Sequence, residues 1–430
     1  MSGFVKTLRQ RLEDIRARAL WRELRRVDTA QGPWIEVAGR LLLNFSSNDY
    51  LGLANHPAVR AAVAEAGSRW GAGAGASRLI CGSLAPLHEL EAALAAFKGT
   101  PAALVFGSGY AAAAGTIPAL VGPGDVVVLD KLSHACLVDG ARLSGAKLRV
   151  FAHNDLDDLE GILRWARSSP RADSGTGRPP VVLVVTESVF SMDGDWAPLR
   201  ELVALKERYG AWLLVDEAHA TGLYGDQRRG LAEACGVADR IEVQMGTLGK
   251  ALGSAGGYIC GAGELIELLV NRARSFIFST APVPAQAAAA TTAVGIVQSE
   301  EGRRLGGLLW ERVGELRRGL AGLGLTLGGP GVSQAPDTAS LAQKSAILPL
   351  IVGEEVAALT LAERLRKAGC LVPAIRFPTV ARGAARLRIT VSAAHTSEDI
   401  QRLVAAIEAA LAEHGPVAAW MASDRPALGG

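Results

Sequence analysis

IEVQMGTLGKALGSAGGYIC, at residues 241–260, is the stretch that decides how the rest of this chain is interpreted. It opens with alternating apolar residues, typical of a strand, and then becomes glycine-rich around one lysine, Lys250. Lysine is seldom buried without a partner, so most lysines in such a loop lie at the surface. The alternative is an amine held in a tight, partly desolvated turn, where a lowered pKa suits it to form a Schiff base. Lys250 alone leaves both interpretations open.

Apolar strands alternate with helix-length segments along the middle of the chain. Strands are predicted at residues 103–106, 125–130, 149–151, 181–185, 212–215 and 241–245. Continuous apolar strands separated by helices indicate a mostly parallel α/β sheet. In such sheets ligands bind at the carboxyl ends of the strands, and Lys250 follows one of those ends.

Both ends of the chain differ from this central pattern. An amphipathic N-terminal helix is predicted from apolar residues at helical spacing, namely Phe4, Leu8, Leu12, Ile15, Ala19 and Leu24. We divide the chain into an arm (1–46), a large domain (47–290) and a smaller α+β C-terminal domain (291–430). In the last, strands at 346–352, near Leu371 and at 386–390 alternate with helices at 355–368 and 397–414. Polar loops at 168–180 and 329–345 and a poorly ordered tail at 415–430 complete the prediction.

Composition excludes several classes of protein. The 430 residues are 49% hydrophobic and 20% charged, which suits one large core and one smaller core. A formal net charge of +2 favours neither nucleic acid nor an anionic membrane as a partner. The five cysteines form no C-x-x-C pair, so we expect reduced thiols and no metal site. No signal peptide or membrane-spanning run is recognisable, and a cytoplasmic location is expected.

FGSGY at residues 106–110 is a glycine turn between a predicted strand and a predicted helix. Backbone N–H groups and the helix dipole at such a turn favour a phosphate. Gly107, Gly109 and Ala112, with Asp130 at the end of the next strand, also imitate a dinucleotide fingerprint. A dehydrogenase or a dinucleotide-binding module therefore stays open at this point, as does a helix start that needs glycine only for packing.

Asp216 and His219 weigh against the dinucleotide interpretation. Asp216 directly follows an apolar strand, where an unpaired carboxylate is costly, although it could instead cap the next helix. A pyridoxal phosphate enzyme needs a lysine, an acidic partner for the pyridinium nitrogen and a helix start for the phosphate. All three lie here at carboxyl ends of strands, whereas a dinucleotide enzyme leaves Lys250 and Asp216 unexplained. No G-x-S-x-G elbow supports a serine hydrolase.

Two further residues near strand ends allow more than one interpretation. His134 follows the DVVVLD strand, where its ring could stack on a flat cofactor or make ordinary loop contacts. Asp193, in the run SMDGD, is interpreted as a turn former. Neither residue decides the function without the rest of the chain.

Eight motifs spread along the chain are far more specific together than singly. They are NFSSNDYLGL (44–53), FGSGY (106–110), DKLSHA (130–135), FAHND (151–155), TESVFSMDGD (186–195), VDEAHATG (215–222), GTLGKALG (246–253) and AIRFPTV (374–380). With these motifs the sequence resembles the α-oxoamine synthases, fold-type I pyridoxal phosphate enzymes, and most closely their biotin-synthesis branch. The resemblance implies a mostly parallel seven-stranded sheet flanked by helices, and a homodimer with its sites at the subunit interface.

The resemblance also implies a role for each matched residue. Lys250 holds the cofactor as a Schiff base and moves the substrate's α-proton, Asp216 pairs with the pyridine nitrogen, and His134 stacks on the ring. The other implied cofactor-binding residues are Gly109, Tyr110, Ser191, His219 and Thr247. The implied substrate-binding residues are Arg25, His134, Arg376 and Thr379. Ser279 and Thr280 are expected to reach the cofactor phosphate of the neighbouring subunit.

The reaction implied by the resemblance is a decarboxylative condensation of L-alanine with a pimeloyl thioester. The acyl carrier is either coenzyme A or an acyl carrier protein, as pimeloyl-CoA or pimeloyl-ACP. Glycine-using family members, of the 2-amino-3-ketobutyrate CoA ligase and 5-aminolevulinate synthase types, remain the alternative because they share most motifs. Arg376 favours the alanine-using branch, since the glycine-using relatives lack an arginine at that place.

Overall fold

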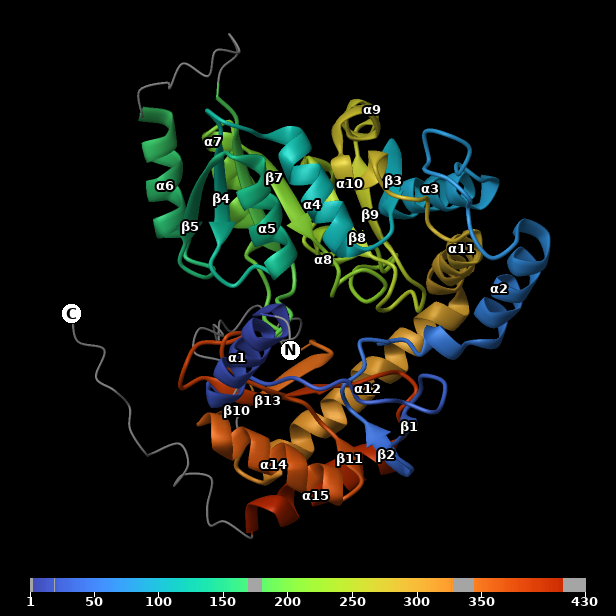
Figure 1. Ribbon diagram of the computed structural model, residues 1–430, viewed down its shortest axis with the longest axis vertical. Coiled ribbons are helices and arrows are strands. Elements are labelled where there is room, and N and C mark those ends of the chain that lie inside the picture. Colours follow the sequence, from blue (N-terminus) through green and yellow to red (C-terminus); the bar gives the residue numbers. More distant parts are fainter. Residues whose placement is uncertain (1–2, 19, 169–179, 326, 328–343, 413–430) are drawn as a thin grey trace.

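The computed structural model describes residues 3–18, 20–168, 180–325, 327 and 344–412. Two lobes with separate sheets are joined by the long helix α12 (Glu300–Gly322), which runs from one lobe into the other (Figure 1). The polar loops predicted at 168–180 and 329–345 lie almost wholly outside the described residues, and the predicted tail at 415–430 lies wholly outside them.

The larger lobe contains a seven-stranded sheet. Its strands, in spatial order, are β3 (Ala102–Phe106), β9 (Gly257–Gly261), β8 (Val243–Thr247), β7 (Trp212–Asp216), β6 (Val182–Glu187), β4 (Val126–Asp130) and β5 (Lys147–Phe151). Only β9 runs antiparallel to its neighbours β3 and β8, and the other pairings are parallel. The predicted fold class, with its mostly parallel seven-stranded sheet, is therefore confirmed.

Helices cover both faces of this sheet (Figure 1). Val127 and Leu129 of β4 join one apolar cluster, and Val126 and Val128 join the other, as expected for side chains that alternate across a strand. One face is covered by α4 (Gly109–Leu120), α5 (Ala135–Ser144), α9 (Gly263–Arg272) and α10 (Arg274–Ile277). The other is covered by α3 (Ala85–Lys98), α6 (Leu156–Ser168), α7 (Leu199–Arg208), α8 (Leu231–Ala234) and α11 (Pro284–Gln298), with α2 (Pro57–Trp70) against α11. Short 3-10 turns lie at Leu53–Asn55 and Ala238–Arg240.

The smaller lobe combines two three-stranded sheets with helices α14 (Glu355–Lys367) and α15 (Ser397–Ala412). One sheet is antiparallel, with β13 (Ala385–Thr390) between β10 (Ile347–Gly353) and β12 (Ala374–Ile375). In the other, β2 (Arg40–Asn44) pairs with β1 (Trp34–Val37) and lies parallel to β11 (Cys370–Leu371). The first strands of the chain are thus built into the same lobe as its last.

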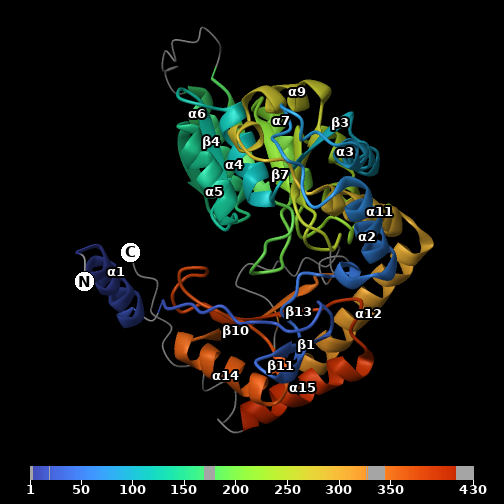
Figure 2. The ribbon, with the colours of Figure 1, turned by 45° about the vertical axis from the view of Figure 1, so that its right-hand side comes forward.

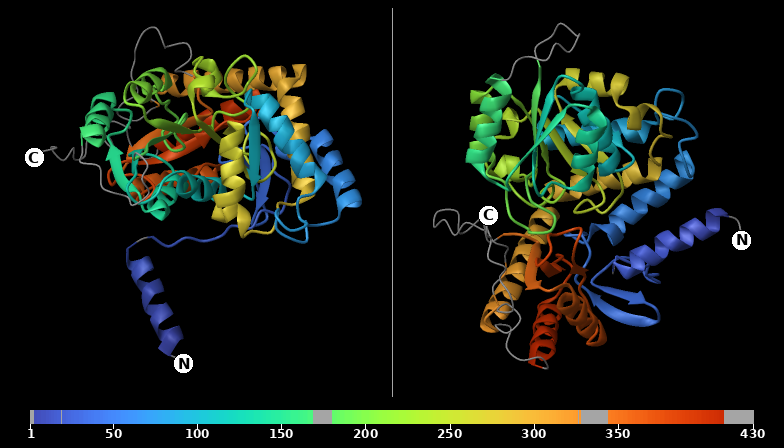
Figure 3. Two further views of the ribbon diagram at one scale, coloured as in Figure 1. Left: turned by 90° about the horizontal axis from the view of Figure 1, so that it is seen from above. Right: turned by 60° about the vertical axis from the view of Figure 1, so that its left-hand side comes forward.

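Helix α1 (Gly3–Ala17) projects away from both lobes (Figure 2 and Figure 3). None of its residues is buried, and Phe4 is 71% exposed. The helical stripe predicted as far as Leu24 is wrong, because the helix ends at Ala17 and residues 20–26 form neither helix nor strand. No helix within the described residues is both long and apolar enough to cross a membrane.

Candidate active site

Three neighbouring strands of the large sheet end in polar residues at one edge. Glu187 ends β6, Asp216 ends β7 and Thr247 ends β8. Glu187 lies opposite Asp216 in the register, and Lys250 follows Thr247 by three residues. Because parallel strands end at the same edge, two predicted site residues, Lys250 and Asp216, are brought together here, with Glu187 beside them.

Burial controls the charges of this group. Asp216 and Glu187 are 5% and 2% exposed. Burial raises the pKa of Asp216, an effect that the charge of Lys250 opposes. Burial and then the charge of Asp216 raise the pKa of Glu187 to about 8. Burial lowers the pKa of the Lys250 amine, although both carboxylates oppose the shift. An amine with a lowered pKa is more often unprotonated, which a nucleophilic lysine requires.

His134 lies at the start of α5, beside the buried carboxylates. Its backbone N–H donates to Glu187 Oε1 at 2.6 Å. Its ring Nδ1 accepts the backbone N–H of Cys136 at 3.2 Å and caps the helix. Because Nδ1 is the acceptor in this bond, the single proton of the neutral ring lies on Nε2. The residue is exposed, so its side chain is accessible to a ligand.

His219 is buried behind the same strand ends. Its Nδ1 lies 2.7 Å from the hydroxyl of Tyr50, which fixes the direction of the ring. Burial, followed by the charge of Lys250, lowers the pKa of His219 well below its usual range. The imidazole is therefore neutral at physiological pH, as suits a residue that forms hydrogen bonds without carrying charge.

The predicted phosphate turn has the shape and the free polar group that an anion needs. Helix α4 begins at Gly109, where an added Cβ would lie only 2.5 Å from Thr247 Cγ2. Glycine therefore lets the helix start approach the end of β8. Thr247 Oγ1 is buried and has no hydrogen-bond partner within the described part of the chain, which is rare for a buried hydroxyl. A phosphate at this helix start would provide that partner, so the residues fit the predicted cofactor.

Tyr110 is placed at the edge of this turn. Its side chain is half exposed, and its hydroxyl donates to Asp139 Oδ2 at 2.8 Å. That hydrogen bond raises the pKa of Tyr110. Its backbone N–H, in the first turn of α4, is the group of this residue that can face a phosphate.

The loop that carries Ser191 is held by the smaller lobe. Ser191 is buried, and its carbonyl accepts the Nε–H of Arg388 at 2.6 Å. Arg386 forms an ion pair with Asp193 and donates to the carbonyl of Met192 at 3.3 Å. Glu187 and Arg388 were not among the residues predicted from the sequence. A usable signal was present, because two arginines alternate within β13, where all six residues are buried.

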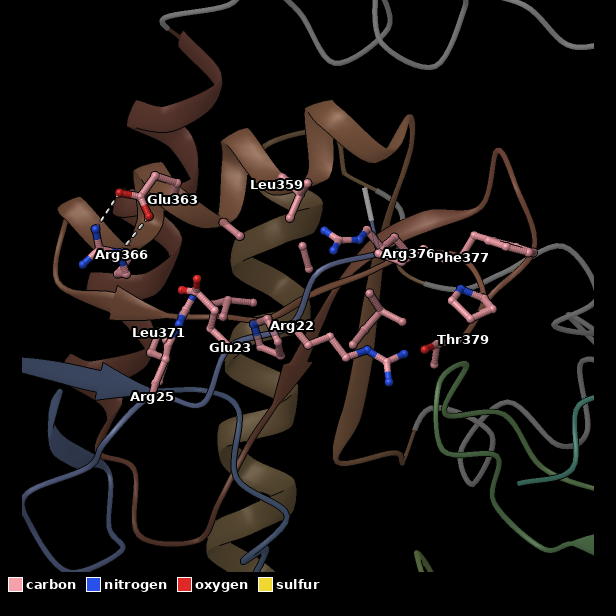
Figure 4. Close-up of a pocket in the computed structure, with 17 residues that line it drawn as sticks. Arg22, Glu23, Arg25, Leu359, Glu363, Arg366, Leu371, Arg376, Phe377 and Thr379 are labelled. Carbon is pink, nitrogen blue, oxygen red and sulfur yellow. Dashed lines mark hydrogen bonds and ion pairs between the residues drawn. The ribbon is translucent and has the colours of Figure 1, made fainter. Parts of the chain in front are cut away.

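The three predicted substrate-binding residues outside the large lobe line one pocket. The pocket has a volume of about 760 Å³ and is lined by Arg25, Arg376 and Thr379. Arg376 donates to the carbonyl of Trp21 at 3.4 Å, which ties the pocket wall to the arm. In Figure 4, Arg25 lies near the Glu363–Arg366 ion pair, and Arg376 and Thr379 lie toward the other end. Such a pocket, with guanidinium groups at separated points, suits an elongated anionic ligand.

Ser279 and Thr280 are not brought to this group of residues. Both are exposed, and Thr280 forms an isolated bridge with Ser77. The next residue, Ala281, donates its N–H to the carbonyl of Ala76 at 3.0 Å. The expected reach toward a neighbouring subunit therefore stays a prediction.

Comparisons with known proteins agree with the geometry. The model of the aminotransferase class I and II family matches residues 40–407. The 8-amino-7-oxononanoate synthase of Anaeromyxobacter sp. (strain K) is 49% identical over 405 residues, which cover 94% of this chain and 95% of that protein. The protein of the same name from Geobacter sulfurreducens is 48% identical, covering 92% and 95% of the two chains.

Solved structures with the same fold extend this result. The serine palmitoyltransferase of Sphingomonas wittichii is 31% identical with a TM-score of 0.83, covering 95% of this chain and 97% of that one. An SPT structure that contains pyridoxal phosphate has the same identity and TM-score, with coverage of 95% and 96%. The 8-amino-7-oxononanoate synthase of Francisella tularensis is 25% identical with a TM-score of 0.68, covering 86% and 97%. The resemblance derived from the eight motifs is thus confirmed.

Proposed function

Because this chain belongs to the aminotransferase class I and II family, and is nearly half identical to curated 8-amino-7-oxononanoate synthases, we propose that it condenses L-alanine with a pimeloyl thioester. The products would be 8-amino-7-oxononanoate, carbon dioxide and the free thiol carrier, as a step of biotin synthesis. The observation that carries the proposal is the buried group of Lys250 and Asp216 next to the orphaned hydroxyl of Thr247. Glycine-using relatives remain the alternative, which a comparison of substrate pairs would exclude.

The cofactor of this enzyme is pyridoxal phosphate. When bound, it supplies an electron sink that stabilises negative charge at the α-carbon of an amino acid. Thr247 Oγ1 and the N–H groups at the start of α4 would hold its phosphate, and Asp216 would pair with its ring nitrogen. His134 would contact the ring face, and His219 and Ser191 would contact its polar edge.

The chain's own groups move the protons and orient the reactants. The Lys250 amine, with its lowered pKa, is suited to take the proton from the α-carbon and later to return one. Asp216 is buried close to that amine, and its carboxylate would keep a proton on the nitrogen of a bound ring. The neutral ring of His219 adds a hydrogen bond and no further charge to the site.

The arginines of the pocket supply the substrate contacts in this proposal. Arg376 would bind one carboxylate with two parallel hydrogen bonds, as guanidinium groups commonly do. Arg25, at the other end of the pocket, would meet the distal carboxylate of a dicarboxylic acyl chain. Thr379, at the same end of the pocket as Arg376, would contribute a hydroxyl there.

A comparison of substrate pairs tests the proposal directly. We expect L-alanine with pimeloyl-CoA to give a higher kcat/KM than glycine with acetyl-CoA or succinyl-CoA, measured by thiol release and product mass. A pocket that accepts the methyl group of alanine gains only about 1–3 kcal/mol over glycine, so weak activity with glycine is compatible with the proposal. A higher kcat/KM for a glycine pair would contradict the substrate assignment and leave the cofactor assignment intact.

The second expected result concerns Asp216→Asn. The amide cannot hold a positive charge on the ring nitrogen, so we expect α-proton exchange of L-alanine to slow by about 10²-fold or more. Exchange into heavy water, followed by proton NMR, measures this step without the acyl substrate. The matched control is Asp125→Asn, which removes another buried carboxylate, located at the amino end of β4. Wild-type exchange in Asp216→Asn would contradict the assignment.

A further inference from the structure

The histidine of the FAHND motif lies between two carboxylates, one at the end of β4 and one in the loop that carries Ser191. His153 Nδ1 lies 2.9 Å from Asp130 Oδ1, and His153 Nε2 lies 2.7 Å from Asp195 Oδ2. The His153 side chain is 18% exposed, and that of Asp130 is fully buried. Neither the fold nor the proposed reaction gives this arrangement a role.

The geometry favours a charged ring at position 153. Ionised carboxylates only accept hydrogen bonds, and a neutral imidazole has a single N–H, so two such bonds need an imidazolium. Burial lowers the pKa of His153, but the hydrogen bonds to Asp130 and Asp195 and their charges outweigh it and raise the pKa to about 10. Two of the carboxylates that follow His153 in the chain, Asp155 and Asp158, accept backbone N–H groups of residues 158 and 152.

One of these carboxylates starts the loop that carries His134. Asp130 is the last residue of β4, and its Oδ1 also accepts the N–H of Leu132 at 2.8 Å. Its Oδ2 accepts the N–H of Asn154 at 3.0 Å. The loop between β4 and α5 is therefore fixed at its beginning by residues 153 and 154, and it ends at His134.

The other carboxylate belongs to the loop that carries Ser191. The backbone carbonyl of Asp195 accepts the N–H of Phe190 at 3.0 Å, and this hydrogen bond closes the turn around Ser191. The ring of Phe190 packs edge-on against His153 with centroids 4.4 Å apart. Without a cation between them, Asp130 and Asp195 would present like charges to each other.

We propose that His153 is a positioning residue, whose bonds to Asp130 and Asp195 hold the loops of His134 and Ser191 together at the cofactor site. The inference rests on the proposed function, because it assigns those two residues to cofactor binding. Arg386 and Arg388 hold the Ser191 loop from the smaller lobe, and His153 holds it from the larger one. The Ser191 loop is thus fixed on two sides, and the imidazolium of His153 connects it to the loop that carries His134.

The ring state of His153 provides the first test and needs no substrate. In the wild-type protein labelled with ¹⁵N-histidine, we expect both ring nitrogens to be protonated at about pH 8, above the ordinary histidine pKa of about 6.5. The spectrum of His153→Gln assigns the signal. A neutral ring at that pH would overturn the proposal. The pKa of His153 is raised in the folded protein. Its contribution to the free energy of unfolding is therefore complete below about pH 6.5 and is lost as the pH rises toward about 10.

Cofactor binding and turnover provide the second test. In His153→Gln we expect weaker pyridoxal phosphate binding, an altered visible circular dichroism of the bound cofactor, and a kcat lowered by about 10²-fold, as for a misplacement of about 1 Å. His56→Gln is the matched control, since it removes a histidine bound to Glu301 at 3.1 Å, far along the chain from both loops. A structural role alone would lower the melting temperature and leave the dichroism and cofactor affinity unchanged, which would contradict positioning.

A milder variant keeps the test decisive if His153→Gln does not fold. Asp195→Asn retains the bond to Asp130 and removes the charge on the Ser191 loop, so the same spectral change is expected with a smaller size. An unchanged dichroism in Asp195→Asn would overturn the proposal. If the wild-type protein binds pyridoxal phosphate but turns over no amino acid with a thioester, the proposed function fails, while the ring state and cofactor affinity still test this inference.

Discussion

Lys250→Ala is expected to abolish measurable turnover while leaving the fold intact. The amine lies where burial lowers its pKa, next to the buried carboxylates Asp216 and Glu187. In the proposed function this amine binds the cofactor covalently and moves a proton, so its removal should lower kcat by at least about 10²–10⁴-fold, the range typical of a general base alone. Thiol release with L-alanine and pimeloyl-CoA measures the loss.

A chemical label separates this role from a general structural effect. Borohydride reduction of the wild-type holoenzyme, followed by peptide mapping, should place the pyridoxyl group on the peptide that contains Lys250. Lys147→Ala is the control, since that exposed lysine lies at the edge strand β5, over the ring of Trp165. A label on another lysine, or a Lys250→Ala variant that keeps wild-type turnover, would contradict the assignment.

Local sequence patterns predicted most of the large sheet because buried parallel strands are continuous apolar runs. The strand they missed is β9, which begins and ends with glycine and runs antiparallel. Packing explains why β9 begins with glycine, because a Cβ on Gly257 would lie 2.6 Å from Gly109 Cα. Gly257 therefore interrupts the apolar pattern by which β9 could have been predicted, and it also lets the glycine turn before α4 lie close to the sheet.

Contacts between distant parts of the chain could not be predicted in the same way. The pairing of Leu43 with Cys370 builds the first strands into the C-terminal lobe, and no local periodicity encodes it. The bond from Arg388 to the Ser191 carbonyl likewise joins two lobes. Glu187 is different, because it ends an apolar strand just as Asp216 does. A carboxylate at such a strand end needs a partner, so Glu187 could have been predicted on the same grounds as Asp216.

Lys98→Met is expected to destabilise the protein strongly, because it leaves a carboxylate in the core without its cation. Lys98 forms an ion pair with Glu217, and their side chains are 1% and 0% exposed. Lys98 also donates to the carbonyl of Arg229 at 2.6 Å. Removing one partner leaves the other charge buried without compensation, which costs about 3–5 kcal/mol of unfolding free energy. The shift of the urea midpoint at constant slope measures it.

The size of that loss depends on whether the remaining carboxylate can reach water. Lys206→Met is the matched control, because Lys206 is also buried but its partner Glu242 is 38% exposed. Glu242 can be hydrated when the lysine is removed, so we expect a loss of only about 1 kcal/mol. Adding Glu217→Gln to Lys98→Met removes the stranded charge and should restore part of the stability, which a double-mutant cycle quantifies. Equal losses in Lys98→Met and Lys206→Met would show that burial of the partner is not what sets the cost.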